Sequence, residues 1–161
     1  LDILIPFARY PIDKWDINSD HKVEVLQGAC LMLRREPLDQ IGLLDEGYFM
    51  YSEEVDLCHR LLKSGWGIYW LPQAKVVHHG GQSSSQAPME SFIQLYKGKV
   101  IYFRKHHGVA AAFAYKLILA AASLARLLLM PLSVLERRTQ RERHLGLARQ
   151  YRRLLTQMPG M

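Results

Sequence analysis

The sequence predicts an α/β domain that is followed by apolar and basic helices. Strand-like and helix-like segments alternate as far as residue 108, residues 109–135 are almost wholly apolar, and residues 136–161 are rich in arginine. The chain has 161 residues, of which 49% are hydrophobic, so it can bury a core, and disordered, collagen-like and disulfide-rich classes are excluded. We therefore expect three parts with these boundaries: a domain over 1–108, an apolar helix over 109–135 and a basic helical tail over 136–161.

The first elements are predicted from short local patterns. Residues 23–33 (VEVLQGACLML) are apolar and begin with β-branched residues, which predicts a buried strand. Gly28 lies inside this run, where a glycine indicates that another group approaches the backbone closely. Residues 34–44 (RREPLDQIGLL) predict a short helix, because Pro37 suits its first turn and Gly42 suits its C-cap.

A second helix is predicted after Ser52, which suits the N-cap, and it ends at Gly65. Helical spacing places Glu53, Asp56 and Arg60 near one another. The same spacing puts the apolar residues on another face of the helix: Val55, Leu57, Cys58, Leu61 and Leu62.

The following segments predict strands, a loop and a long helix. Residues 66–79 (WGIYWLPQAKVVHH) suggest two strands interrupted at Pro72, and residues 80–86 (GGQSSSQ) suggest a flexible loop. Residues 90–107 have aromatic and aliphatic side chains at helical spacing, so we expect a helix there.

The two cysteines, Cys30 and Cys58, lie in apolar contexts and lack the CxxC spacing of a zinc or redox site. We therefore expect both to be reduced core residues of a cytosolic protein. The short apolar start of the chain contains Asp2 and has no basic leader, which argues against a signal peptide.

The apolar stretch over 109–135 exceeds the roughly 20 residues that cross a bilayer. Lys116 and Arg126 interrupt it, and together with Ser123 they form a narrow polar stripe at helical spacing. This pattern favours a helix that lies in the membrane interface, or one packed on a partner, over a single lipid-exposed span.

The net charge of +6 is a property of the C-terminal part of the chain. Residues 1–108 carry 12 basic and 13 acidic side chains, whereas residues 109–161 carry 9 basic and 2 acidic ones, a net charge of +7. This distribution argues against a nucleic-acid binder and favours contact with an anionic membrane surface. The alternative is that the arginines form a solvated helix face.

Three polar clusters are candidates for chemistry. Asp45 and Glu46 form one, and Glu53, Glu54 and Asp56 form the second at the start of a predicted helix. Carboxylates at a helix N-terminus suit a general base or an acceptor of hydrogen bonds from sugar hydroxyls, although acidic helix caps without function are common. The third cluster surrounds His78, which precedes two glycines and is either a metal ligand or a structural histidine.

Together these segments resemble the C-terminal half of family-2 glycosyltransferases, particularly the bacterial rhamnosyltransferase-like group. The resemblance runs from Val25 to Gly108. It comprises QGACLMLRR at 27–35, GLLDEGYFMYSEEVDLCHRLLKSGW at 42–66, LPQAKVVHHGGQSS at 71–84 and YFRKHHG at 102–108. An ordered series of this length is far more specific than any single cluster.

The resemblance implies part of a GT-A fold and inverting transfer of a sugar from a nucleotide-sugar donor to a polysaccharide or glycolipid acceptor. It assigns Glu54 as the base, with Glu53 beside it and Asp56 as a second candidate, although the family usually has Asp where this chain has Glu54. Asp45, Glu46 and Gly28 are implied on the acceptor side. His78 is implied at a divalent cation, Mg²⁺ or Mn²⁺.

The family's nucleotide-binding half would precede this segment, and the sequence contains neither a glycine-rich phosphate loop nor a DxD triplet. Residue 1 is also not Met, so we expect a C-terminal fragment or truncated product that has no transferase activity alone. We expect it on the cytoplasmic side, peripheral to or anchored in the inner membrane, and the sequence leaves homo-oligomerisation open. The competing interpretation is a non-catalytic, membrane-bound interaction module derived from a transferase.

Overall fold

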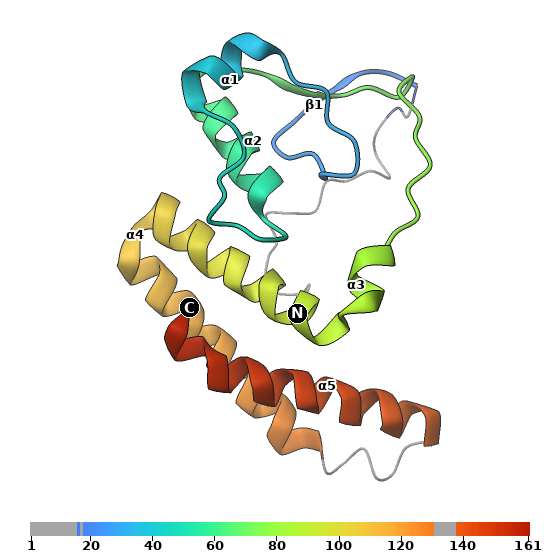
Figure 1. The fold of residues 1–161 in the computed structure, drawn as a ribbon, viewed down its shortest axis with the longest axis vertical. Coiled ribbons are helices and arrows are strands. Elements are labelled where there is room, and N and C mark those ends of the chain that lie inside the picture. Colours follow the sequence, from blue (N-terminus) through green and yellow to red (C-terminus); the bar gives the residue numbers. More distant parts are fainter. Residues whose placement is uncertain (1–15, 17, 131–137) are drawn as a thin grey trace.

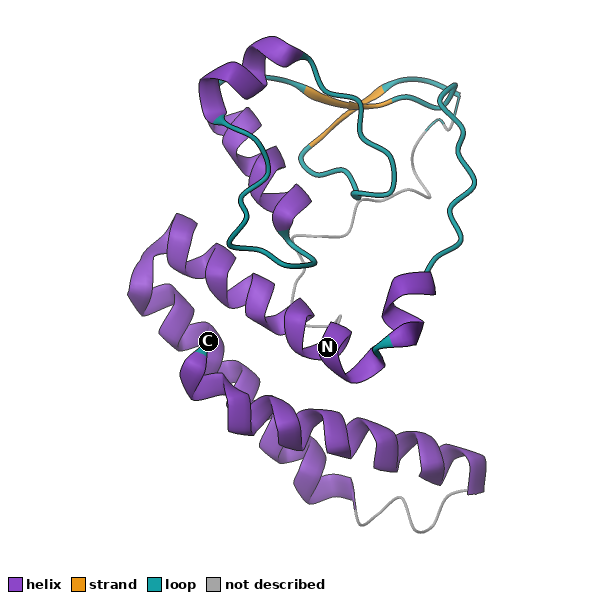
Figure 2. Ribbon diagram, in the orientation of Figure 1, coloured by secondary structure: helices purple, strands orange, loops and turns teal. Residues whose placement is uncertain are grey.

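The computed structural model describes residue 16, residues 18–130 and residues 138–161. In these residues the fold combines helices with one two-stranded antiparallel sheet (Figures 1 and 2). The elements are β1 (His21–Val23), α1 (Arg35–Ile41), α2 (Glu53–Lys63), β2 (Ile68–Trp70), α3 (Gln82–Gln86), α4 (Pro88–Leu129), α5 (Arg138–Gln157) and a final 3-10 turn (Met158–Gly160).

The sheet and α2 share a small apolar core. His21 pairs with Trp70 and Val23 pairs with Ile68 across the two strands. Val23 and Ile68 pack against buried residues on one face of α2: Leu57, Cys58 and Leu61. The predicted apolar face of α2 is therefore confirmed for these three residues.

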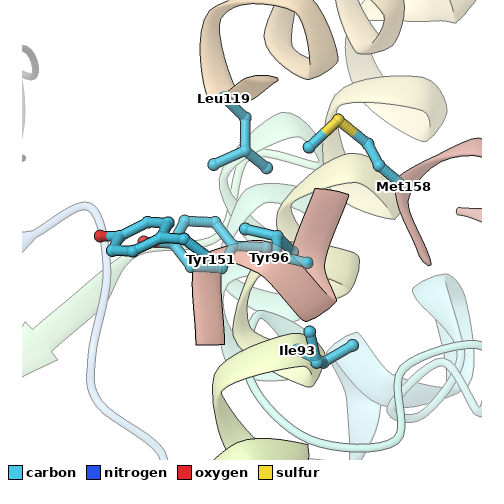
Figure 3. Close-up of a cluster of buried hydrophobic side chains, with 6 residues drawn as sticks. Ile93, Tyr96, Leu119, Tyr151 and Met158 are labelled. Carbon is cyan, nitrogen blue, oxygen red and sulfur yellow. The ribbon is translucent and has the colours of Figure 1, made fainter. Parts of the chain in front are cut away.

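A second core joins α4 to α5 (Figure 3). Ile93 and Tyr96 come from the first part of α4, and Leu119 comes from its second part. They meet Tyr151 and Leu154 of α5, and Leu119 and Leu154 are almost completely buried. One helix thus packs against both parts of α4, and this contact stabilises the C-terminal region.

α4 bends at Gly108, whose backbone is non-helical with a φ of 87°. That conformation is open to glycine at little cost, so the helix direction changes there without strain in a side chain. α4 is also long and apolar enough, by length and composition, to cross a membrane.

The turn that precedes α2 approaches α4 closely at Gly98. Tyr51 and Ser52, which precede α2, have left-handed backbones with φ values of 69° and 72°. A Cβ atom on Gly98 would lie 2.5 Å from the Tyr51 carbonyl oxygen and 3.1 Å from the Ser52 hydroxyl. The absence of a side chain at Gly98 therefore permits the turn that leads into α2.

Several sequence predictions are confirmed. Residues 35–41 form α1, which contains Pro37 and ends at Gly42 in a left-handed conformation. The N-cap of α2 is Ser52, although its side chain makes no capping hydrogen bond. The predicted helices over 90–107 and after 136 are present as parts of α4 and α5, while residues 131–137 lie outside the described residues.

Other predictions are wrong. The predicted strand over 23–33 is a strand only at Val23, because the chain turns at Gly28 and leaves most of the segment exposed. The second strand predicted within 66–79 is absent from this described segment, and residues 82–86 of the predicted loop form α3. Cys58 is buried as expected, but Cys30 is exposed, since it lies in this turn segment rather than in a buried strand.

Replacing Gly98 with alanine should destabilise the fold by about 1–3 kcal/mol, because the new methyl group would clash with the Tyr51 carbonyl. The matched control is Gly146→Ala in α5, where no atom lies within 4 Å of the added Cβ. That variant should gain roughly 0.5–1 kcal/mol from helix propensity. Urea unfolding followed by circular dichroism measures both, and equal effects would contradict the proposed close contact.

Candidate functional site

A cavity of about 360 Å³ lies beside the N-terminus of α2. Three segments surround it: the turn around Gly28, the residues that lead into α2, and the segment that contains His78. The lining residues are Gln27, Gly28, Ala29, Met50, Tyr51, Glu53, Glu54, His78, His79, Gly81, Gln82 and Ser84. The cavity thus brings together four of the predicted site residues, namely Gly28, Glu53, Glu54 and His78.

The two glutamates contribute carboxylate oxygens that no protein group satisfies. One oxygen of Glu53 and one of Glu54, Oε2 in each case, is buried and lacks a hydrogen-bond partner among the described residues. Buried polar atoms are normally paired, so unpaired ones at a cavity are suited to bind a ligand or to take up a proton.

The pKa of Glu54 is raised, mainly because burial disfavours its charged form. The negative charge of Glu53 raises it further, and the backbone N–H groups of Glu54 and Val55 partly oppose the increase. A carboxyl group with a raised pKa is a stronger base once it is ionised, which is the property required to deprotonate a hydroxyl group.

Gly28 lies directly against Glu54. A Cβ at position 28 would be 3.6 Å from the Cβ of Glu54, which is ordinary van der Waals contact. The Glu54 side chain is thus the group beside Gly28, at a distance that a side chain at position 28 would tolerate.

His78 lines the cavity and is exposed. The described residues contain no group of three or more His, Cys, Asp or Glu side chains arranged to hold a metal ion.

Asp56 does not line the cavity and is the centre of a separate network. Its side chain is completely buried, and its carboxylate accepts from Arg60 Nε at 2.8 Å, Lys105 Nζ at 2.9 Å and His106 Nε2 at 2.7 Å. The Tyr48 hydroxyl donates to the same carboxylate at 3.5 Å. Burial alone raises the pKa of Asp56, but the hydrogen bonds from Lys105, His106 and Arg60 outweigh it, so the pKa is lowered.

The network continues through Arg60 into the chain that leads out of α1. The Arg60 guanidinium donates to the carbonyl oxygens of Ile41 at 2.6 Å and Leu43 at 2.7 Å. Lys105 also joins Asp45 to the network of Asp56, because its Nζ lies 2.6 Å from the Asp45 carboxylate. The hydrogen bond from Lys105 and that from the Gly47 backbone lower the pKa of Asp45.

The predicted site residues therefore divide into two groups. Glu53, Glu54, Gly28 and His78 share the cavity, whereas Asp45 and Asp56 belong to the ion-pair network. Glu46 is exposed and lines neither. The helical phase correctly places Asp56 beside Arg60.

Sequence reasoning did not assign roles to the partners of Asp56 on α4. Lys105 and His106 lie in the YFRKHHG segment that contributes to the family resemblance. That segment is the sequence signal that could have identified them. His59 packs beside them: its ring centroid is 4.1 Å from that of His106, and its Nδ1 atom is 2.9 Å from the Tyr102 hydroxyl. Burial and the neighbouring His106 lower the pKa of His59.

Comparisons with known proteins identify relatives among glycosyltransferases. The chain is 39% identical over 89 residues to an N-acetylglucosaminyl-diphospho-decaprenol L-rhamnosyltransferase of Mycobacterium tuberculosis, covering 55% of this chain and 29% of that protein. It is 34% identical over 79 residues to rhamnosyltransferase WbbL of Escherichia coli, covering 49% of this chain and 30% of that protein. It is 32% identical over 74 residues to the low-salt glycan biosynthesis hexosyltransferase Agl10 of Haloferax volcanii, covering 46% of this chain and 24% of that protein.

The chain is similar to part of a glycosyltransferase. The resemblance found in the sequence is thereby confirmed, and each match spans less than a third of the relative's length. No protein-family model matches the chain, and no solved structure matches it.

The ion-pair network of this glycosyltransferase-like chain predicts a large cost for removing the Asp56 charge. Asp56→Asn should lower the free energy of unfolding by roughly 3 kcal/mol at pH 7, because Arg60 and Lys105 would lose a buried partner. Since the folded pKa of Asp56 is lowered, its contribution is present above the unfolded pKa of about 3.9 and disappears as the pH falls through the folded value.

Urea unfolding between pH 3 and pH 7 measures this difference. The matched control is Asp39→Asn, which removes the exposed ion pair with Arg35 and should change stability by at most about 0.5 kcal/mol. A similar small effect for Asp56→Asn would show that the network does not support the fold.

Glu54→Gln should stabilise the fold at neutral pH, because it removes a carboxylate whose charged form is disfavoured by burial and by Glu53. The raised folded pKa means that wild-type stability decreases as the pH rises from the unfolded pKa of about 4.3 through the folded value. The difference between variant and wild type should therefore grow over this range and vanish below it. A variant that is less stable than wild type at pH 7 would contradict this account.

Proposed function

We propose that the chain is the acceptor-side part of a GT-A glycosyltransferase that transfers a sugar, with inversion, from a nucleotide-sugar donor. The observation that carries the proposal is the cavity lined by Glu54, a residue with a raised pKa and a buried carboxylate oxygen that lacks a hydrogen-bond partner. The similarity to rhamnosyltransferases and a hexosyltransferase supports the same class of reaction.

In this proposal Glu54 is the general base. Its carboxylate takes the proton from an acceptor hydroxyl while the oxygen forms a bond to the anomeric carbon of the donor. The bond from that carbon to the nucleotide diphosphate breaks, and the diphosphate leaves with the bonding electron pair. Inversion requires only this in-line displacement, so no enzyme nucleophile is needed.

Glu53 and Gly28 have supporting roles. Glu53 lies next to Glu54 in the sequence, and its charge contributes to the raised pKa of Glu54. Gly28 keeps the wall of the cavity close to Glu54 without a side chain that would occupy the acceptor's place. Asp56 is fully engaged by Arg60, Lys105 and His106, so we assign it to positioning α2 rather than to the base.

A divalent cation, Mg²⁺ or Mn²⁺, would neutralise charge on the leaving diphosphate in such a reaction. His78 is the residue of this chain that we propose as one ligand, since it lines the cavity that contains Glu54. The other ligands would come from a nucleotide-binding half. We accordingly propose that residues 1–108 are the C-terminal part of the catalytic domain and that this chain alone does not turn over nucleotide sugars.

The proposed acceptor is a saccharide carried on a lipid or a polysaccharide. The name of the Mycobacterium tuberculosis relative states that it acts on N-acetylglucosaminyl-diphospho-decaprenol, which is lipid-linked. The long apolar helix α4 supports a location at the inner face of the cell membrane, where such acceptors are used. The second candidate function is a non-catalytic membrane-bound module. Only the apolar helix α4 supports it.

Glu54→Gln in the transferase that contains this chain should reduce kcat by about 100-fold or more, because the acceptor hydroxyl would lose its base. Donor binding should be unchanged, since in our proposal Glu54 contacts the acceptor hydroxyl and the proposed cation ligand His78 is not altered. Transfer of radiolabelled sugar and donor binding by calorimetry measure the two quantities. Glu36→Gln, at an exposed glutamate in α1, is the matched control.

Two results would overturn the proposal. Full activity of Glu54→Gln would exclude it as the base, and sugar transfer by residues 1–161 alone would exclude the proposed dependence on a nucleotide-binding half.

A further inference from the structure

The polar side chains in the second part of α4 point toward α5. Lys116 donates to the backbone carbonyl of Met161 beyond the end of α5, and the Arg126 guanidinium lies 5.2 Å from the centre of the Tyr151 ring. Ser123 is completely buried and donates to the Leu119 carbonyl at 2.6 Å. Ser123 is therefore buried and Lys116 partly buried, whereas Arg126 is exposed and lies over the Tyr151 ring.

An adjoining side of the same helix is apolar and exposed. We call it the outer face of α4, and it consists of Val109, Phe113, Leu117, Leu124 and Leu128. These residues are four or seven positions apart, so they line one side of the helix. Their exposed fractions run from 51% for Leu124 to 79% for Leu128.

A water-soluble amphipathic helix buries its apolar side, whereas these apolar residues of α4 are exposed. A continuous exposed apolar stripe of this length marks a surface that contacts an apolar environment. The charges of α4 and α5 indicate that this environment is anionic. Residues 109–130 contain Lys116 and Arg126 but no acidic residue, and Arg149 and Arg152 of α5 are exposed.

We propose that the outer face of α4 inserts into the headgroup and acyl boundary of an anionic lipid bilayer, with the helix parallel to the membrane plane. The exposed arginines of α5 supply attraction to anionic headgroups, and the apolar stripe supplies insertion. This proposal rests on α4 and α5 and does not require the transferase activity proposed above.

The packing of α5 explains why α4 lies on the bilayer and does not cross it. α5 packs along α4 through Leu154 and Tyr151, which meet Leu119. A crossing α4 would carry this arginine-bearing helix into the hydrocarbon region, where charged side chains are strongly disfavoured. A helix in the interface leaves α5 on the aqueous side.

The inserted helix is also connected to the site. Before the bend at Gly108, the same helix supplies Lys105 and His106 to the network of Asp45 and Asp56. Insertion of the outer face therefore fixes the position of α2 and its cavity relative to the membrane.

Flotation of residues 1–161 with vesicles tests the insertion. We expect the protein to float with vesicles of phosphatidylcholine and phosphatidylglycerol at 0.1 M salt, and to retain part of the binding at about 0.5 M salt. Binding should fall at least tenfold when three exposed residues of the outer face are replaced: Phe113→Gln, Leu117→Gln and Leu128→Gln. The matched control replaces three exposed apolar residues elsewhere and should bind as wild type does: Met32→Gln, Phe49→Gln and Val77→Gln.

Depth measurement distinguishes lying from crossing. In a Cys30→Ser background, where Cys58 is buried, cysteines introduced at Val109, Leu117 and Leu128 would carry nitroxide labels. We expect all three labels to report similar depths near the acyl boundary. A label at Leu117 near the bilayer centre, with the other two close to opposite surfaces, would overturn the interfacial arrangement.

Two further results would overturn the proposal. Unchanged vesicle binding by the outer-face variant would show that another surface contacts lipid. A dimer detected by sedimentation without lipid, and converted to monomer by the same three substitutions, would show that a second copy of the chain covers the outer face.

Discussion

The buried carboxylate of Asp56 holds α2 and α4 together. It accepts from Arg60 on its own helix and from Lys105 and His106 on α4, so two helices far apart in the sequence share one charge. Arg60 extends the contact to the carbonyl groups that follow α1. A carboxylate without exposure is stable only when it is paired in this way, and each partner is thereby restricted to one geometry.

This arrangement separates stability from chemistry within one helix. Asp56 lies on the side of α2 that faces α4, where its carboxylate is paired with cationic groups and its pKa is lowered. Glu54, two residues earlier, lines a cavity, has a buried carboxylate oxygen without a partner, and has a raised pKa. The left-handed backbone at Tyr51 and Ser52, permitted by Gly98, directs the helix start into this position. The buried, unpaired carboxylate oxygen of Glu54 is energetically unfavourable. It is tolerated because other contacts, such as those of Asp56, keep α2 in place.

The sequence predicted the features that depend on local signals and missed those that depend on distant contacts. Pro37, Gly42 and the spacing of Leu57, Cys58 and Leu61 are enough to place α1 and α2, because caps and periodicity act within a few residues. The apolar run from Val23 does not become a long strand, since in the described residues it pairs only with the three residues of β2. The hydrogen bond between Asp56 and His106 joins residues fifty positions apart, and no local sequence pattern predicts it.

The polar stripe of α4 shows why a correct sequence pattern can leave function open. Lys116, Ser123 and Arg126 share one side of the helix whichever way that side faces. In water the stripe would face solvent, and in contact with lipid it would face the protein. In the structure Lys116 donates to the Met161 carbonyl, and the exposed Arg126 lies over the Tyr151 ring of α5. The sequence pattern alone therefore does not reveal the environment of the apolar side of α4. The contacts that the polar residues make in the structure are the evidence for it.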